Sequence, residues 1–154
     1  MCWIGLTINK KIATKDIKCK KIIVYVKNGR YSCYAPYYFT TDMIYEIGKG
    51  YSRNICAKPL NDFSTYTRIT NGLHSYSEEC TAILRMDGGI IIKTKTTEKV
   101  VFTKVHSECS SSGYMEPVLV ECTIPKGSTY YENKYGEIVS DRLKINKVLI
   151  HNTK

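Results

Sequence analysis

The sequence has no long hydrophobic run. No stretch of its 154 residues approaches the roughly 20 consecutive apolar residues that cross a bilayer as a helix. The first eight residues are mostly apolar, but Asn9-Lys10-Lys11 follows at once, so the segment is too short for a secretory signal. We therefore expect a soluble protein that stays in the cytoplasm of the cell that makes it.

Cysteine pairs at redox or metal-binding spacing are also missing, since no CxxC motif occurs. The seven cysteines are odd in number and widely spaced, unlike the even, dense set of a secreted disulfide scaffold. We expect most of them to be reduced and buried as small apolar residues. They are Cys2, Cys19, Cys33, Cys56, Cys80, Cys109 and Cys122.

Known catalytic signatures are missing as well. No P-loop, GxSxG, HExxH or paired-carboxylate motif occurs. His106 and Cys109 could ligate a metal, but no second pair follows at ligand spacing, so neither a zinc site nor a cofactor is expected. Sequence-specific DNA binding is not expected either, because the chain has no helix-turn-helix or zinc-finger pattern.

Acidic residues are scarce in the first part of the chain. Residues 1–58 hold 11 Lys or Arg against 3 Asp or Glu, a balance of +8, whereas residues 59–154 hold 12 against 11. The formal net charge of +9 therefore lies almost entirely in the N-terminal segment. This asymmetry predicts an anionic partner, with a merely soluble basic surface as the alternative.

Tyrosines are concentrated in the same segment, where seven of the 13 lie between residues 25 and 51. Aromatic faces stack on bases and Lys or Arg neutralise phosphate, so the mixture suits a nucleotide or a single strand. Tyrosine is also an anchor at protein interfaces and a common half-buried strand residue, so a protein partner and a structural role stay open. The residues are Tyr25, Tyr31, Tyr34, Tyr37, Tyr38, Tyr45 and Tyr51, interleaved with Lys20, Lys21, Lys27, Arg30, Lys49 and Arg53.

Most secondary-structure signals are those of strands. Residues 17–26 pass from alternation to a continuous apolar run, which predicts a strand central in a sheet. Asn28-Gly29 predicts a hairpin turn, with residues 30–34 as the return strand. Further β-branched runs predict strands at 4–8, 90–95, 99–106, 118–124 and 143–151, with loops at 52–70 and 107–113.

Helix signals are fewer. Ser77 can cap a helix and the two glutamates after it suit a helix start, which predicts a helix over 77–86 before the stop at Asp87-Gly88-Gly89. A second short helix is predicted over 40–47. The predicted architecture is one α+β domain over residues 1–154, with a mainly antiparallel sheet and one or two short helices.

Two short segments have polar residues beside these elements. Residues 72–77 precede the expected helix, whose free N–H groups would attract an anion, and His74 and Ser75 could add donors. The alternative is a plain turn with an N-cap. In residues 124–131, Pro125 ends a strand and Lys126-Gly127 predicts a structural β-turn, after which the chain resumes as a strand.

Several motifs occur in the same order in a known group of proteins. They are DIKCKK (residues 16–21), YEIGKGY (45–51), GLHSY (72–76) and IPKGSxYY (124–131), the last followed by VSD (139–141). The set resembles a group of small proteins from gut Bacteroidetes and their phages and covers most of the chain. The resemblance implies a phage or mobile-element protein acting in a host cell, and it implies no activity.

The IPKGS stretch is also similar to a late segment of the ADP-ribosyltransferase-like fold. That more distant resemblance implies a nucleotide-shaped cleft and, in an active member, catalysis on NAD. The chain departs from the pattern at each catalytic place: Lys20 or Lys21 stands where Arg belongs, residues 74–77 replace Ser-Thr-Ser, and Glu137 lacks its companion Glu. These departures favour binding over catalysis.

The features together predict a non-enzymatic counter-defence protein that sequesters an anionic nucleotide in a basic, tyrosine-rich cleft. The alternatives are a protein-binding inhibitor of a host defence protein and an ADP-ribosyltransferase-like enzyme. Pairing of two copies through a sheet edge or face also stays open. The expected ligand-binding residues are Lys20, Lys21 and Arg30 on phosphate, Tyr31, Tyr34, Tyr37 or Tyr38 on a base, and His74, Ser75 and Tyr76 at the helix start.

Overall fold

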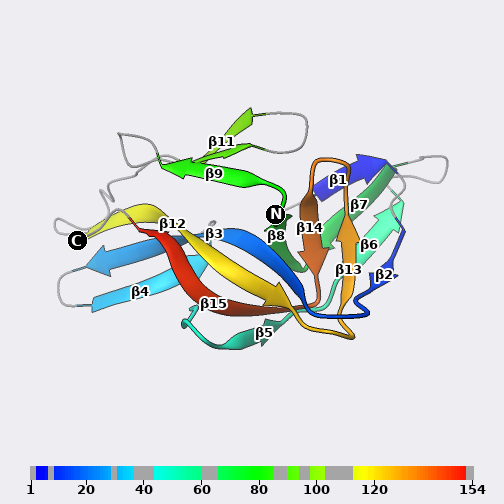
Figure 1. Cartoon of the computed structure of the whole chain (residues 1–154), viewed down its shortest axis with the longest axis horizontal. Coiled ribbons are helices and arrows are strands. Elements are labelled where there is room, and N and C mark those ends of the chain that lie inside the picture. Colours follow the sequence, from blue (N-terminus) through cyan, green and yellow to red (C-terminus); the bar gives the residue numbers. More distant parts are fainter. Residues whose placement is uncertain are drawn as a thin grey trace.

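A computed structural model describes residues 3–6, 9–28, 31–36, 44–59, 66–84, 90–93, 98–102 and 113–151. Every regular element in these residues is a strand (Figure 1), and the strands form one nine-stranded sheet and two three-stranded sheets. All strand pairs are antiparallel. The predicted α+β class is therefore wrong, because the described part of the chain is all β.

Two long strands form the centre of the large sheet. β3 (Ile17–Asn28) and β12 (Gly113–Ile124) pair along all 12 residues of each. β15 (Arg142–His151) lies on the other edge of β12. The strands predicted at 17–26, 118–124 and 143–151 are confirmed, because β-branched and apolar side chains suit a sheet that is covered on both faces.

The remaining edge of β3 is shared by two strands. β8 (Leu73–Ser77) pairs with its start and β4 (Tyr31–Pro36) with its end. Asn28 pairs with Tyr31, while Gly29 of the predicted hairpin turn lies outside the described residues. The sheet is completed by β14 (Glu137–Ser140), β13 (Thr129–Glu132) and β2 (Lys11–Ile12) beyond β8, and by β5 (Gly50–Ser52) beyond β15.

The two small sheets contain segments with weaker sequence signals. One has the order β1 (Trp3–Leu6), β7 (Tyr66–Asn71) and β6 (Cys56–Pro59), so the loop predicted at 52–70 is wrong in part. The other has the order β11 (Glu98–Phe102), β10 (Ile90–Lys93) and β9 (Thr81–Leu84). The loop predicted at 107–113 lies outside the described residues except for Gly113, which begins β12.

In the described part of the helix predicted over 77–86, residues 77–84 form a turn and a strand, while residues 85 and 86 lie outside the described residues. The N–H of Cys80 donates to the carbonyl of Ser77 at 3.0 Å, and the N–H of Glu79 donates to the hydroxyl of Ser77 at 3.3 Å. Ser77 thus caps a single turn and not a helix. After this turn, β9 pairs with β10, and the side chains of Ile90 and Ile92 become buried. Tertiary pairing thus outweighs local helix propensity.

The helix predicted over 40–47 is also absent from the described part of its range, while residues 40–43 lie outside it. Tyr45 forms a β-bridge with Tyr34, and its N–H donates to the Tyr34 carbonyl at 2.8 Å. Gly48 follows with a φ of 92°, a conformation that glycine adopts without strain. The chain therefore meets the sheet edge as an extended segment that turns into β5.

The turn predicted at Lys126-Gly127 is confirmed. The N–H of Ser128 donates to the Pro125 carbonyl at 3.0 Å, and Gly127 has a φ of 89°. The carboxylate of Asp16 accepts from the N–H of Lys126 at 2.8 Å. The IPKGS motif therefore forms the turn that connects β12 to β13. Asp16 of the DIKCKK motif holds this turn beside the start of β3.

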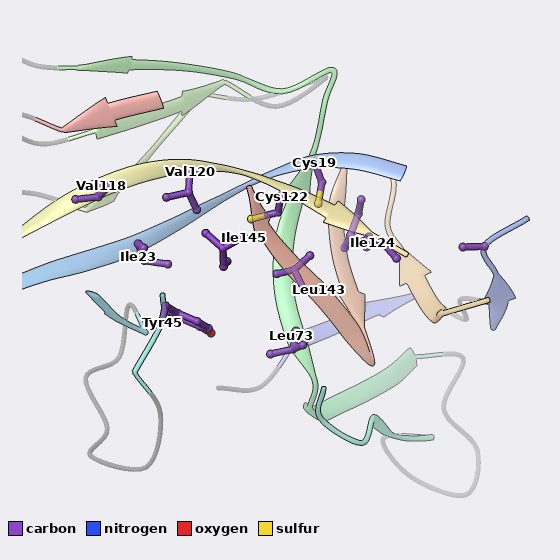
Figure 2. Close-up of a cluster of buried hydrophobic side chains, with 12 residues drawn as sticks. Cys19, Ile23, Tyr45, Leu73, Val118, Val120, Cys122, Ile124, Leu143 and Ile145 are labelled. Carbon is purple, nitrogen blue, oxygen red and sulfur yellow. The ribbon is translucent and has the colours of Figure 1, made fainter. Parts of the chain in front are cut away.

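The large sheet has two faces with different coverings. Its inner face contributes Cys19, Ile23, Val120, Cys122 and Leu143 to the main buried cluster (Figure 2). On the outer face, Ile22 and Leu119 pack against Ile90 and Ile92 of the β9–β10–β11 sheet. A third, smaller cluster joins Ile69 and Val139 beside β6 and β7.

Candidate anion-binding site

Lys20 and Lys21 are adjacent in β3, and the pleat of the strand therefore places them on opposite faces of the sheet. Lys21 follows Cys19 and precedes Ile23, which both belong to the inner cluster. Lys20 lies on the outer face with Lys18. Lys20 and Lys21, which were both expected to contact phosphate, therefore lie on opposite sides of the sheet.

The ammonium of Lys21 is inside the protein. The residue is 8% exposed, and its Nζ donates to the carbonyl of His74 at 2.5 Å and lies 5.8 Å from the centre of the Tyr45 ring. Burial lowers the pKa of Lys21 to about 8, although the nearby thiols of Cys122 and Cys19 oppose the shift. Lys21 therefore joins β3 to β8 within the core.

Two thiols lie beside this ammonium. Cys19 and Cys122 are register partners on β3 and β12, and both are completely buried (Figure 2). A hydrogen bond from Cys122 lowers the pKa of the Cys19 thiol, and the same contact together with burial raises that of Cys122. Of the five described cysteines, these two and Cys80 are buried as predicted, whereas Cys33 and Cys56 are half-buried.

His74, Ser75 and Tyr76 lie on β8, so they do not stand at a helix start and the proposed anion site there loses its free N–H groups. Ser75 is 4% exposed; its hydroxyl lies near Cys19 and makes no other hydrogen bond within the described residues. Tyr76 packs against the outer cluster. Burial, with the charges of Lys21 and Arg53, lowers the pKa of His74 to about 4.

The described tyrosines of the N-terminal cluster mostly pack inward. Tyr25 and Tyr34 lie 5.5 Å apart between ring centres, and the His151 ring is 4.8 Å from Tyr25 and 5.9 Å from Tyr34. Tyr45 is 3% exposed, and its ring meets that of Tyr51 edge to face at 5.0 Å. The structural alternative therefore accounts for these four tyrosines.

Some expected ligand-binding residues cannot be placed. Arg30, Tyr37 and Tyr38 lie outside the described residues, and Tyr31 is described only through its backbone at the start of β4. Tyr34 is placed, and burial followed by the charge of Tyr25 raises its pKa. The expected base-stacking role of the tyrosines thus stays a prediction.

A buried acid–base pair lies near the same tyrosines. Oε1 of Glu116 is 3.3 Å from Nε2 of His151, and the side chain of Glu116 is 2% exposed. The catalytic glutamate implied by the transferase resemblance lies elsewhere, because Glu137 accepts from the side-chain amide of Asn133 at 2.8 Å. That contact closes the turn between β13 and β14.

The exposed part of the outer face is strongly basic. Register partners on β3, β12 and β15 form two rows of side chains there, with Lys18, Thr123 and Lys144 in one and Lys20, Glu121 and Lys147 in the other. Arg142 precedes Lys144 by two residues and so faces the same side. We call Lys18, Lys20, Arg142, Lys144 and Lys147 the basic face.

Existing contacts occupy part of this face. The ammonium of Lys20 donates to the carbonyls of Glu78 at 3.1 Å and Cys80 at 2.8 Å. Lys18 lies 3.8 Å from the carboxylate of Glu121 and keeps 60% of its side chain exposed. Lys144 and Lys147 are exposed as well. Glu121 is the carboxylate within the two rows, and Asp16, whose carboxylate accepts from the N–H of Lys126, precedes Lys18 by two residues.

A hollow of about 420 Å³ lies at the end of the basic face. Arg142 donates to the carbonyl of Lys126 at 2.9 Å, and the N–H of Arg53 donates to the carbonyl of Asp141 at 2.8 Å. The Asp141 carboxylate accepts from the N–H of Thr129 at 3.0 Å. The lining residues are Ser52, Arg53, Asn54, Asp141 and Arg142. Two arginines, an aspartate, a serine and an asparagine thus line one polar depression.

The sequence reasoning missed Arg142, Lys144 and Lys147, because the charge balance of the C-terminal part is close to neutral. A signal was nevertheless present. Arg142 and Lys144 alternate with Leu143 and Ile145, a period of two that predicts one basic and one buried face of a strand.

Comparison of the chain with protein families, with curated proteins and with solved structures found no match. Among the described residues, no group of three or more His, Cys, Asp or Glu side chains could hold a metal ion. None of those residues forms a helix long and apolar enough to cross a membrane.

Proposed function

We propose that the protein binds an anionic nucleotide in the hollow lined by Arg53 and Arg142, and that it acts by sequestering this ligand without transforming it. The observation that carries the proposal is the convergence of two arginines from different segments on one polar depression. The resemblance to phage proteins supplies the context, which is counter-defence in the cytoplasm of a host cell.

The chemistry of the lining supports a phosphate-bearing ligand. A guanidinium group presents paired donors that match two phosphate oxygens, and such charge-assisted hydrogen bonds are stronger than neutral ones. Ser52 and Asn54 add a hydroxyl and an amide to the same depression. The Asp141 carboxylate repels any phosphate in this depression, an effect that the arginines have to outweigh, and it could accept from a sugar hydroxyl or a base amino group.

The tyrosine-rich docking surface of the alternative hypothesis has less support. The four described tyrosines of that segment that show ring contacts, Tyr25, Tyr34, Tyr45 and Tyr51, pack against one another or against His151. Tyr45 is buried and the other three are half-buried, so a host protein would contact these rings only in part. The nucleotide proposal instead rests on charged and polar groups that face the hollow.

Isothermal calorimetry with a panel of mono-, di- and cyclic nucleotides tests the proposal. Arg142→Gln should weaken binding at least about tenfold, the effect of losing one hydrogen bond to a charged group. Arg142→Lys keeps the positive charge and loses the paired donors of the guanidinium group. Its affinity should lie between that of the unmodified protein and that of Arg142→Gln. Lys134→Gln, an exposed cation on the β13–β14 turn, is the matched control.

The proposal fails if no nucleotide binds, or if Arg142→Gln binds as tightly as the unmodified protein. Thermal unfolding of each variant separates a lost ligand contact from a lost fold, because Arg142 also bonds to the Lys126 carbonyl. Mass spectrometry of small molecules released from the purified, denatured protein would identify a ligand that is carried through purification.

A further inference from the structure

The hollow continues into a line of positive charge. Arg142 lines the hollow and also begins the basic face, and Lys144 follows it on the same side of β15. Residues two apart on a strand are separated by about 6.7 Å. Lys18 and Lys144 then lie in one row and Lys20 and Lys147 in the next, so positive charge recurs at steps of about 7 Å away from the hollow.

From this arrangement we infer that the ligand is a phosphodiester chain, a short single-stranded oligonucleotide, rather than an isolated nucleotide. This inference rests on the proposed function, because one phosphate of the chain lies in the hollow against Arg53 and Arg142. The next phosphate lies between Lys18 and Lys144, and the one after it beside Lys147. The step of the charges is comparable with the distance between successive phosphates in an extended single strand.

The width of the face favours one strand of nucleic acid. Lys18 and Lys144 are two strands apart in the sheet, which separates their backbones by about 10 Å. A strip of this width follows one phosphate backbone, whereas a duplex presents two backbones across a groove of about 12 Å. Tyr76, at the edge of this face, packs against Ile22 and its neighbours. Recognition is therefore electrostatic and independent of base sequence.

Two carboxylates lie along the path proposed for the oligonucleotide: Asp141 in the hollow and Glu121 between the rows of lysines. The carboxylate of Glu121 accepts from the side-chain amide of Asn146 at 3.3 Å and pairs with Lys18 at 3.8 Å. Asn146 also donates to the hydroxyl of Thr123 at 2.7 Å. These contacts hold the Glu121 carboxylate along the sheet. When a phosphate lies in the first row, it replaces Glu121 as the partner of Lys18.

A length series of oligothymidylates tests the inference, with one, two, four and eight nucleotides titrated by calorimetry at several salt concentrations. Affinity should rise up to about four nucleotides and then level off, because three phosphates fill the hollow and the two rows. The logarithm of the binding constant should fall with that of salt concentration with a slope near −2, about −0.7 for each of three phosphates.

The variant Lys144→Gln/Lys147→Gln isolates the face from the hollow. It should weaken binding of the eight-nucleotide strand at least about tenfold and reduce the salt slope by about 1.4, while binding of the dinucleotide changes less than about twofold. Lys58→Gln/Lys134→Gln removes two exposed cations from other parts of the molecule and is the matched control. It should leave the affinity and slope close to those of the unmodified protein.

The outcomes separate the two proposals. One outcome is that the dinucleotide binds, that its binding depends on Arg142, and that longer strands bind no more tightly. This result overturns the inference of a phosphodiester chain as the ligand and leaves the proposed function standing. If nothing in the series binds, the inference fails, and the panel of mono-, di- and cyclic nucleotides decides the proposed function separately. A control variant that loses as much affinity as Lys144→Gln/Lys147→Gln, or polyglutamate that displaces the strand at equal charge concentration, also overturns the inference.

Discussion

Lys20 and Lys21 are neighbours in the chain, but β3 places them in different surroundings. The inner face buries Lys21 to 8% exposure, gives its ammonium one carbonyl partner and lowers its pKa to about 8. On the outer face Lys20 stays partly exposed and donates to two carbonyls of the turn after β8. Burial on the inner face therefore disfavours the charged form of a lysine, whereas the partly exposed outer face accommodates a lysine that hydrogen-bonds to two carbonyls.

The comparison shows why a count of charges along the sequence does not locate a binding surface. Lys21 adds to the +8 of the N-terminal segment but cannot meet a ligand at the surface. Lys144 and Lys147 come from the nearly neutral part of the chain, yet they share rows with Lys18 and Lys20. Strand pairing, rather than position in the sequence, assembles the basic face.

The largest expected effect comes from Lys21→Met. Because the folded pKa of about 8 lies below the ordinary 10.5, the folded protein binds fewer protons between these values, so its stability rises with pH across that range. The shift corresponds to about 3 kcal/mol. The variant should lose this slope and gain about 1–2 kcal/mol at pH 7, after the loss of one hydrogen bond. Chemical denaturation from pH 7 to 10.5 measures both.

Lys20→Met is the matched control on the other face. It should keep the alkaline rise in stability and lose at most about 1 kcal/mol, since it gives up two partly exposed hydrogen bonds. The charge of Lys21 also helps to lower the pKa of the Cys19 thiol, so the difference between the variants reports Lys21 together with its effect on that thiol. Equal pH slopes in the two variants would break the comparison between the faces.

A smaller effect is expected from His74, whose pKa is affected by burial and by the charges of Lys21 and Arg53. Burial, Lys21 and Arg53 lower its pKa to about 4, below the ordinary 6.5. The folded protein then binds fewer protons below pH 6.5, so stability is complete above that value and falls as the pH approaches 4. The loss should be about 2 kcal/mol, reduced from the full shift because the side chain is only partly buried.

His74→Gln checks this prediction, because glutamine keeps a polar side chain and does not titrate. Denaturation at pH 7, 5.5 and 4 should show a shallower acid loss in the variant, and the carboxylates common to both proteins cancel in the difference. An unchanged acid slope would mean that burial and the charges of Lys21 and Arg53 do not lower the pKa of His74 in the folded protein.

The sequence predicts the centre of the fold well, since β-branched runs locate β3, β12 and β15. It does not decide which lysine of the Lys20-Lys21 pair points inward, because the alternation of residues 17–21 breaks at that step. The inward choice depends on Cys122 and Tyr45, which other segments bring to the site.

The helix at 77–86 could not be corrected from local signals. Ser77 and the two glutamates after it suit a helix start, but they suit a turn between strands equally well. The outcome depends on Ile90 and Ile92 of β10, which pair with β9, the strand that follows the Ser77 turn, and become buried. The hollow was equally hidden, because Arg53 and Arg142 are far apart in the sequence.

The smallest expected effect is that of Lys18→Gln, which removes an exposed cation from the basic face. The folded protein should lose no more than about 0.5 kcal/mol in denaturation, because the Lys18–Glu121 pair spans 3.8 Å with 60% of the Lys18 side chain exposed. If the basic face holds a phosphodiester chain, the same substitution should reduce the salt slope of octathymidylate binding by about 0.7. A stability loss near that of a buried residue would mean that Lys18 supports the fold. An unchanged salt slope would place the ligand elsewhere. This one variant therefore shows whether the charge of Lys18 supports the fold or binds a ligand.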